Sequence, residues 1–166
     1  NVAANPAIAD RITVSNACIS PTDGPVRMGS RSSQAGGDGA SSMLYADSDV
    51  GWEVDGLQLG TACAKHGIET IGLLKMDVEG AESALIPALA ERLNKTHPTL
   101  MLSMHPHFMS NPQADTRAIA EVLQSYPYLY TAEMESITAD HLCDSSNLGA
   151  AYEVVATTRS VEELRH

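Results

Sequence analysis

Aromatic side chains, basic residues and long apolar runs are all scarce in this chain. Aromatics make up 4% of its 166 residues, and 10 Lys and Arg stand against 21 Asp and Glu, which gives a formal net charge of -11. Such a surplus of negative charge repels a phosphate backbone, so we expect no nucleic-acid partner. No apolar run approaches the roughly 18 residues of a membrane span, and the first residues lack a basic-then-apolar signal pattern. We therefore predict no membrane span and a cytoplasmic location.

Cysteine is scarce too, because only Cys18, Cys63 and Cys143 occur, odd in number and widely spaced. This spacing fits neither a disulfide framework nor a zinc site, so reduced, partly buried thiols are the preferred interpretation. Hydrophobic residues nevertheless reach 43%, and with few aromatics the core must be built from Leu, Ile, Val, Ala and Met. A chain of this length is expected to form one ordinary domain with a sizeable core.

The stretch LLKMDVEGAE, residues 73–82, is the centre of the sequence. An apolar run that ends abruptly in Asp77, Glu79 and Glu82 is typical of a buried strand that emerges into a site. Gly80 can adopt a backbone conformation closed to other residues and so allows a sharp turn. Because open α/β sheets bind ligands beyond the carboxyl ends of their strands, we expect this stretch to line a ligand cleft.

Strand-like and helix-like segments alternate along the chain, which predicts an α/β fold with a mostly parallel sheet built from βαβ units. Strands are expected at residues 12–19, 26–28, from about 71 to 76, 99–104, 128–132 and 153–157. Helices are expected within residues 57–66, from Pro87 onwards after a short turn, and from Asp115 or Thr116 to Pro127. Residues 133–149 have the polar, irregular composition of a loop.

Residues 30–42 (SRSSQAGGDGASS) form a loop rich in glycine and serine with no periodicity. The loop contains neither GxGxxG nor GxxxxGK, which argues against phosphate binding. Shortly after it, Asp47 and Asp49 follow an apolar segment. This Asp-x-Asp pattern is also how metal-dependent nucleotide-sugar glycosyltransferases present two carboxylates to manganese, so a glycosyltransferase is one alternative. A solvated acidic turn is the simpler interpretation of the same two residues.

The string KMDVEGAE resembles the signature of the FkbM-type S-adenosylmethionine-dependent methyltransferases, in which an apolar run precedes Lys-Ile-Asp-Val-Glu-Gly-Ala-Glu. Further matching pieces occur in the family's order, as far as about residue 108. They are the string NACIS at residues 16–20 before Asp23-Gly24, the triplet Ser41-Ser42-Met43, and the pair His105-Pro106 after an apolar strand.

The resemblance implies a Rossmann-like class I methyltransferase fold. The family's first strand, its glycine-rich turn and the acidic residue that ends its second strand would all lie upstream of Asn1. Residues 1–166 are therefore expected to form a single partial domain that lacks the first strand–helix–strand portion. Because the missing parts hold the methionine and ribose of the cofactor, we expect the isolated chain to bind it weakly or not at all. An exposed sheet edge would also favour self-association.

The resemblance further implies that S-adenosylmethionine is the cofactor and that a hydroxyl of a small molecule or carbohydrate accepts the methyl group. Such a transfer often needs a base for the proton of the acceptor hydroxyl, and the catalytic candidates are Asp77, Glu79 and His105. The cofactor-binding candidates, by position, are Asn16, Ala17 and Ser42. We assign no residue to a metal, although the two carboxylates could hold a divalent cation that aligns the acceptor.

Each catalytic candidate also has a structural explanation. Asp77 could cap the turn that follows it, and Glu79 could pair with Lys75 at the surface. Glu82 is best explained by the preference of acidic residues for a helix N-terminus. A histidine that follows an apolar strand and precedes proline, as His105 does, is about as often structural as catalytic.

A non-enzymatic interpretation is open as well. Gly60 stands where the resembled family usually has an aspartate after a leucine, and Ser103 stands where a glutamate usually precedes the His-Pro pair. Together with the absent glycine-rich turn, these departures fit a degenerate Rossmann-like module that serves as an interaction or scaffold domain.

Overall fold

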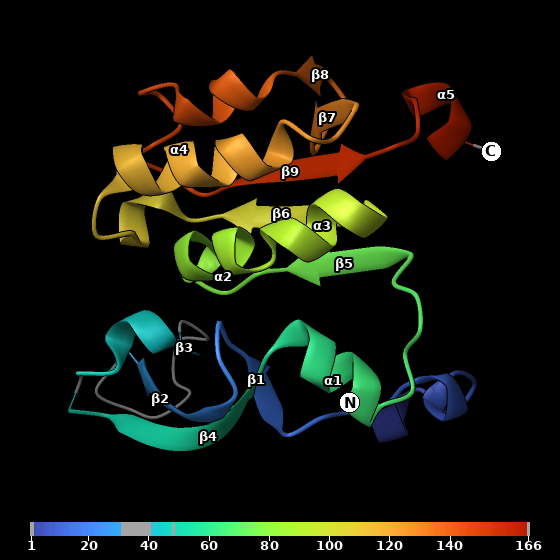
Figure 1. Ribbon diagram of the computed structural model, residues 1–166, viewed down its shortest axis with the longest axis vertical. Coiled ribbons are helices and arrows are strands. Elements are labelled where there is room, and N and C mark those ends of the chain that lie inside the picture. Colours follow the sequence, from blue (N-terminus) through green and yellow to red (C-terminus); the bar gives the residue numbers. More distant parts are fainter. Residues whose placement is uncertain (1, 31–40, 48, 166) are drawn as a thin grey trace.

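A computed structural model describes residues 2–30, 41–47 and 49–165, which form two β-sheets with helices packed against them (Figure 1). The strands are β1 (Ala17–Ile19), β2 (Gly24–Ser30), β3 (Ser41–Ser42), β4 (Gly51–Leu57), β5 (Leu73–Met76), β6 (Thr99–Met104), β7 (Tyr128–Thr131), β8 (Ser136–Ile137) and β9 (Tyr152–Thr157). The α-helices are α1 (Leu59–Lys65), α2 (Glu82–Ala88), α3 (Ala90–Thr96), α4 (Pro112–Leu123) and α5 (Val161–Leu164). Short 3-10 helices are η1 (Val2–Ala4), η2 (Ala9–Arg11), η3 (Met43–Tyr45), η4 (Pro106–Phe108) and η5 (Ala139–Cys143).

The structure contains both helices and sheets, which confirms the predicted α/β class. Both sheets are mixed, so the expected parallel pairing is found only in part. The first sheet has strand order β1-β4-β2-β3 and the second has order β5-β6-β9-β7-β8. Parallel pairing joins β1 to β4 and β5 to β6, and the remaining pairs are antiparallel. In the second sheet the parallel neighbours β5 and β6 are joined by a crossover through α2 and α3, which gives the long connection that parallel pairing requires.

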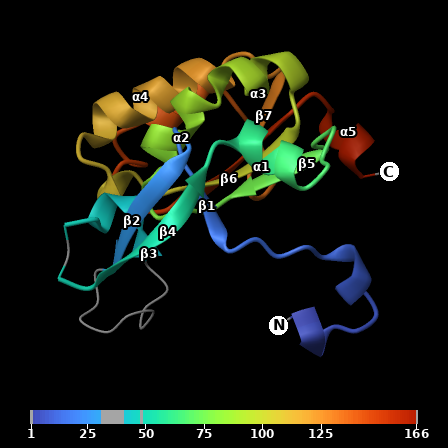
Figure 2. The ribbon, with the colours of Figure 1, turned by 60° about the horizontal axis from the view of Figure 1, so that its bottom comes forward.

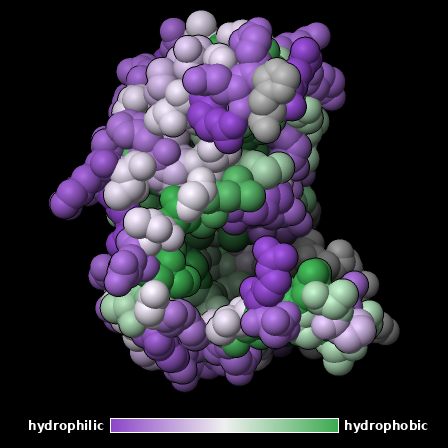
Figure 3. All heavy atoms as spheres, turned by 90° about the vertical axis from the view of Figure 1, so that its right-hand side faces the viewer, coloured by the Kyte–Doolittle hydropathy of each residue, from purple (hydrophilic) through white to green (hydrophobic). Residues whose placement is uncertain are grey.

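Strand β5 lies at an edge of its sheet, which corrects the expectation of a central, buried strand. Among the described residues β5 pairs only with β6. Its first residue, Leu73, is 58% exposed, whereas Met76 at its carboxyl end is buried. The other side of β5 faces a hollow of about 480 Å³, whose apolar lining is visible in Figure 3 and includes Ile19, Leu59 and Leu74. The strand is therefore buried only at its carboxyl end, next to the site. Self-association through its other edge stays a prediction.

The main core lies between the second sheet and the helices that cover one of its faces. Helices α2, α3 and α4 lie side by side over this face (Figures 1 and 2). The buried side chains at their interface come from α2, α4 and β6, and include Leu85, Ile86, Leu100, Leu102, Ile119 and Leu123. As the composition predicts, this core is mostly aliphatic.

Two helix boundaries differ from the prediction. Helix α2 continues through Pro87 and ends at Ala88, because proline removes only its own amide and the N–H of Leu89, the C-cap, still donates to the Leu85 carbonyl at 3.0 Å. Helix α4 begins at Pro112, about one turn before the predicted start. Asn111 is its cap, accepting from the Ala114 amide, and Asp115 instead reaches back to the Asn111 amide.

Other expectations have mixed outcomes. Helix α1 and its left-handed stop at Gly67 are confirmed, as are strands at residues 99–104 and 152–157. The predicted strand at residues 12–19 forms only at its end, and β4 forms where none is predicted, since two glycines obscure its alternation. All three cysteines are free, and two of them are buried. No helix in the described ranges is long and apolar enough to cross a bilayer.

Candidate active site

The carboxyl end of β5 leads into a tight turn that only glycine can complete. Glu79 and Gly80 both have left-handed backbone conformations, with φ of 52° and 93°. A Cβ atom on Gly80 would lie 2.8 Å from Leu44 Cδ1 and 2.9 Å from Phe108 Cβ. The turn therefore brings the backbone close to both η3 and η4, which supports the role predicted for this glycine.

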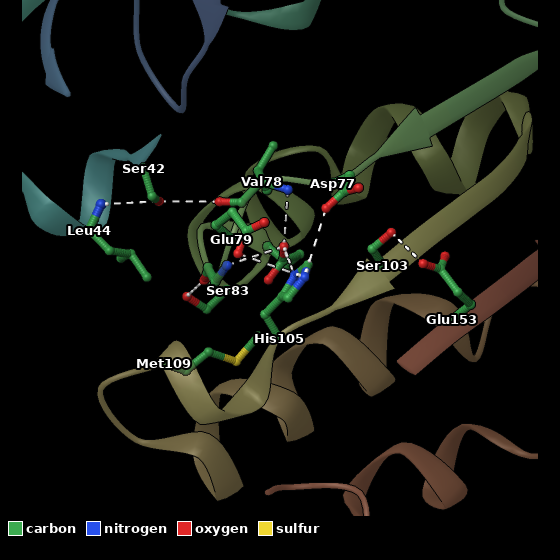
Figure 4. A network of polar contacts seen from close by, with 12 residues as sticks. Ser42, Leu44, Asp77, Val78, Glu79, Ser83, Ser103, His105, Met109 and Glu153 are labelled. Carbon is green, nitrogen blue, oxygen red and sulfur yellow. Dashed lines mark hydrogen bonds and ion pairs between the residues drawn. The ribbon is translucent and has the colours of Figure 1, made fainter. Parts of the chain in front are cut away.

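Parallel pairing of β5 and β6 brings the three predicted catalytic residues together (Figure 4). Met76 lies opposite Leu102, so both strands end at the same edge, where Asp77 and Glu79 follow β5 and His105 follows β6. His105 Nε2 lies 3.8 Å from Asp77 Oδ1 and 3.9 Å from Glu79 Oε2. The exposed fraction of the side chain falls from 53% at Asp77 through 27% at Glu79 to 11% at His105. The cluster thus has an open acidic side and a buried imidazole.

Glu82 is a buried member of the same cluster that the sequence reasoning missed. Its side chain has no exposed surface, and its Oε1 accepts hydrogen bonds from the amides of Val78 and Gly80, both at 3.3 Å. The same oxygen lies 3.1 Å from His105 Nδ1. Although Glu82 does begin α2, it therefore fastens the turn to the histidine instead of facing solvent. The signal in the sequence that could have indicated this role is that Glu82 follows Glu79 by three residues, on the other side of the turn glycine Gly80.

A second polar group flanks the outer side of Asp77. Lys75 Nζ lies 3.6 Å from both Asp77 Oδ2 and Glu153 Oε2, and it donates a hydrogen bond to Ser103 Oγ. Ser103 in turn donates to Glu153 Oε1 at 2.7 Å, because the two residues are directly opposite across the β6–β9 pair. The expected pairing of Lys75 with Glu79 is not what the structure shows. Strand β9 instead supplies a carboxylate beside the position where Ser103 departs from the family pattern.

The three cofactor-binding candidates have different surroundings. Ser42 is buried, and its Oγ donates to the Val78 carbonyl at 3.2 Å while accepting from the Leu44 amide at 3.3 Å (Figure 4). Its hydroxyl therefore holds the turn after β5 against η3. Asn16 is exposed just before β1, and Ala17 is half-buried within β1. Their assignment to the cofactor stays a prediction.

An apolar hollow of about 310 Å³ opens beside the cluster. It is lined mostly by apolar side chains and ends at the ion pair of Lys75 and Asp77. The apolar lining comes from Ile19, Leu59, Leu74, Met76, Val78, Leu85 and Leu89. An apolar ligand body with a polar end would match this lining. Because the hollow opens at the strand edge where the carboxylates lie, the geometry agrees with the cleft predicted from the sequence.

The acidic pair considered for a glycosyltransferase lies apart from this arrangement. Asp47 and Asp49 are both exposed in the irregular segment after η3, and residue 48 between them is outside the described ranges. The glycine- and serine-rich loop predicted at residues 30–42 also falls largely outside them, at residues 31–40. Within the described ranges, Asp77, Glu79 and His105 form the one group of three that could share a metal ion.

The fold and the site together define an α/β protein with an acidic, histidine-containing cluster at the carboxyl edge of two parallel strands. Residues 2–130 match the family described as the Methyltransferase FkbM domain, and the chain belongs to this family. The match includes all four residues of the cluster and confirms the resemblance drawn from KMDVEGAE. No curated protein and no solved structure matches the chain.

Proposed function

We propose that this chain carries the acceptor side of an S-adenosylmethionine-dependent O-methyltransferase site that acts on a hydroxyl of a sugar or another small molecule. The observation that carries the proposal is the convergence of Asp77, Glu79 and His105 in a member of the FkbM methyltransferase family. A buried imidazole between carboxylates is suited to accept a proton, and removal of the acceptor's proton is a step that a protein residue often assists.

The roles of the residues follow from their contacts. Glu82 accepts from His105 Nδ1 and so directs Nε2 towards Asp77 and Glu79. When the O–H bond of the acceptor breaks, its proton passes to Nε2, and the two carboxylates stabilise the imidazolium that forms. The acceptor oxygen then carries the electron pair that makes the new O–C bond.

S-adenosylmethionine, when bound, supplies a methyl group activated by positively charged sulfur. The two carboxylates at the half-exposed edge and the apolar hollow beside Asp77 fit a cationic group with an apolar body. Asn16, Ala17 and Ser42 remain the candidates for binding this cofactor.

The proposal is tested by incubating the purified protein with S-adenosylmethionine labelled in its methyl group and a panel of sugars and other hydroxyl compounds. We expect the label in a methyl ether, detected by mass spectrometry. His105→Ala should lower the rate by about 10²–10⁴-fold. His141→Ala is the matched control, because His141 is a more exposed histidine that also lies beside a carboxylate, Asp144.

A rate unchanged by His105→Ala would contradict the role given to the cluster. If no hydroxyl compound were methylated even at cofactor concentrations high enough to fill a weak site, the interaction-module alternative would be favoured. The glycosyltransferase alternative predicts manganese-dependent binding of a nucleotide sugar that Asp47→Ala abolishes. Family membership favours the methyltransferase over both alternatives.

A further inference from the structure

We propose that Asp77, Glu79 and His105 bind a divalent cation. Their facing atoms are two carboxylate oxygens and one ring nitrogen, and suitable ligand atoms of the three residues all lie within 4.8 Å of one another. Two carboxylate oxygens turned towards one ring nitrogen repel each other, and Lys75, 3.6 Å from Asp77 Oδ2, offsets this charge only from the outer side. A proton on the nitrogen or a bound metal ion would offset it from within the cluster.

The surroundings of Glu82 fix which ring nitrogen faces the carboxylates. Glu82 Oε1 already accepts from two backbone amides, Val78 and Gly80, so it acts as an acceptor towards His105 as well. His105 Nδ1 therefore carries the hydrogen, and in the neutral imidazole Nε2 presents a lone pair to Asp77 and Glu79. A histidine whose other ring nitrogen donates to a carboxylate is the usual arrangement of a metal ligand.

The spacing favours an ion over a proton. Nε2 lies 3.8 Å from Asp77 Oδ1 and 3.9 Å from Glu79 Oε2, which is too long for an N–H···O hydrogen bond. Ligand bonds of about 2.0–2.2 Å place two ligands of one ion up to about 4.4 Å apart. Both measured separations fall within this limit. The ligand atoms of the three residues lie within 4.8 Å of one another, and the half-exposed Asp77 side chain can move to shorten any distance above 4.4 Å.

The charge of the buried carboxylate is a second, independent indication. Glu82 is completely buried, and while its Oε1 contacts His105, its Oε2 has no hydrogen-bond partner among the described residues. A buried carboxylate is costly unless a positive charge lies nearby. Lys75 contacts the outer oxygen of Asp77 and Glu153, so its charge is engaged on the far side of the cluster. A dication on Nε2 would strengthen the hydrogen bond from Nδ1–H to Glu82.

The donor set suits an ion such as Mn²⁺. Mg²⁺ and Ca²⁺ prefer all-oxygen sites, whereas Mn²⁺ and catalytic Zn²⁺ accept imidazole together with carboxylate. One imidazole with two carboxylates suits an ion that accepts both, and three protein ligands leave positions open for an acceptor hydroxyl. The ion would lower the pKa of that hydroxyl, so its proton could pass to solvent instead of Nε2. The activation of the acceptor hydroxyl by the ion rests on the proposed function, whereas the binding of the ion to the three residues does not.

Titration with Mn²⁺, followed by electron paramagnetic resonance and by calorimetry without cofactor, tests the binding directly. The six-line signal of free Mn²⁺ should fall with a stoichiometry of one ion per chain. Asp77→Asn, a change at an exposed side chain, should weaken binding by about 10-fold or more. Glu82→Gln should weaken it about 10–100-fold through the orientation of His105. Asp144→Asn is the control, because it removes a carboxylate beside His141 and leaves the cluster intact.

Stoichiometric binding that Asp77→Asn weakens and Asp144→Asn does not would support the site. No loss of the free signal, or equal binding by both variants, would overturn it, whether or not methyl transfer is found. Methyl transfer that is unaffected by a chelator would overturn only the catalytic use of the ion. Mn²⁺ binding without any methyl transfer would leave the site standing and contradict the proposed function.

Discussion

At the scale of single residues, the buried carboxylate of Glu82 constrains the site most. It receives two backbone amides from the turn after β5 and contacts the imidazole at the end of β6. Because an unpaired buried carboxylate costs several kcal/mol, the turn and the histidine must keep their positions together. Ring stacking adds to this constraint, since His105 lies parallel to Phe108 with centroids 5.8 Å apart.

Gly80→Ala should destabilise the protein by about 2–4 kcal/mol, because the methyl group adds a left-handed backbone penalty to overpacking against Leu44 and Phe108. Urea denaturation followed by circular dichroism measures the change. Gly149→Ala is the matched control, since a Cβ there meets nothing within 4 Å, and its effect should stay within about 0.5 kcal/mol. Equal midpoints for the two variants would contradict the close approach of η3 and η4 to the turn.

At the scale of elements, the packing of α2 and α4 over the second sheet holds the two ends of the site together. Helix α2 begins at Glu82, and α4 follows directly after η4, which begins next to His105. The two helices contact each other, and both carry fully buried side chains, among them Ile86 and Ile119. Loosening this interface should therefore move the carboxylate and the histidine apart.

Ile119→Ala should lower the free energy of unfolding by about 2–5 kcal/mol, because it leaves a cavity at a completely buried position. Thermal and urea unfolding measure the loss. Glu121→Ala, on the exposed side of the same helix, keeps the helix propensity high and should change stability by less than about 0.5 kcal/mol. A loss at Ile119 as small as that at Glu121 would mean that α4 is not packed as described.

At the scale of the whole molecule, the second sheet and its helices form the main core, and a hollow separates β5 from the first sheet. Two tyrosines of the second-sheet half report on this core. Burial raises the pKa of Tyr126 to about 12, and burial likewise raises the pKa of Tyr152. The Tyr126 hydroxyl also has no hydrogen-bond partner among the described residues.

The protein should therefore lose stability at high pH. Below about pH 10 Tyr126 is neutral in both states, but above it the unfolded chain releases the proton more readily than the folded protein, until pH passes about 12. Tyr126→Phe should remove on the order of 1–2 kcal/mol of this alkaline loss and be nearly neutral at pH 7. Tyr128→Phe, at an exposed position, is the control. Parallel stability curves for the wild type and Tyr126→Phe between pH 8 and 11 would refute this.

Comparison of sequence and structure shows which features local patterns could reveal. The apolar run before Asp77, the glycine in the turn and the His-Pro pair after a second apolar strand predicted three members of the cluster, and the structure brings them together. Each of those signals is a short local pattern, although the His-Pro pair lies 28 residues after Asp77. The edge position of β5, the antiparallel entry of β9 and the burial of Glu82 depend on segments far apart in sequence, and no local pattern contains them.

The amino-acid sequence by itself determined the α/β class, the aliphatic core and the acidic residues that follow the strand at residues 73–76, since these depend on composition and short-range periodicity. Only the tertiary structure decided that Glu82 holds His105 and that Glu153 lies opposite Ser103. The physical reason is that strand register and burial bring together side chains far apart along the chain, such as Ser103 and Glu153, which are 50 residues apart. Both are properties of the packed sheet, and the linear pattern does not contain them.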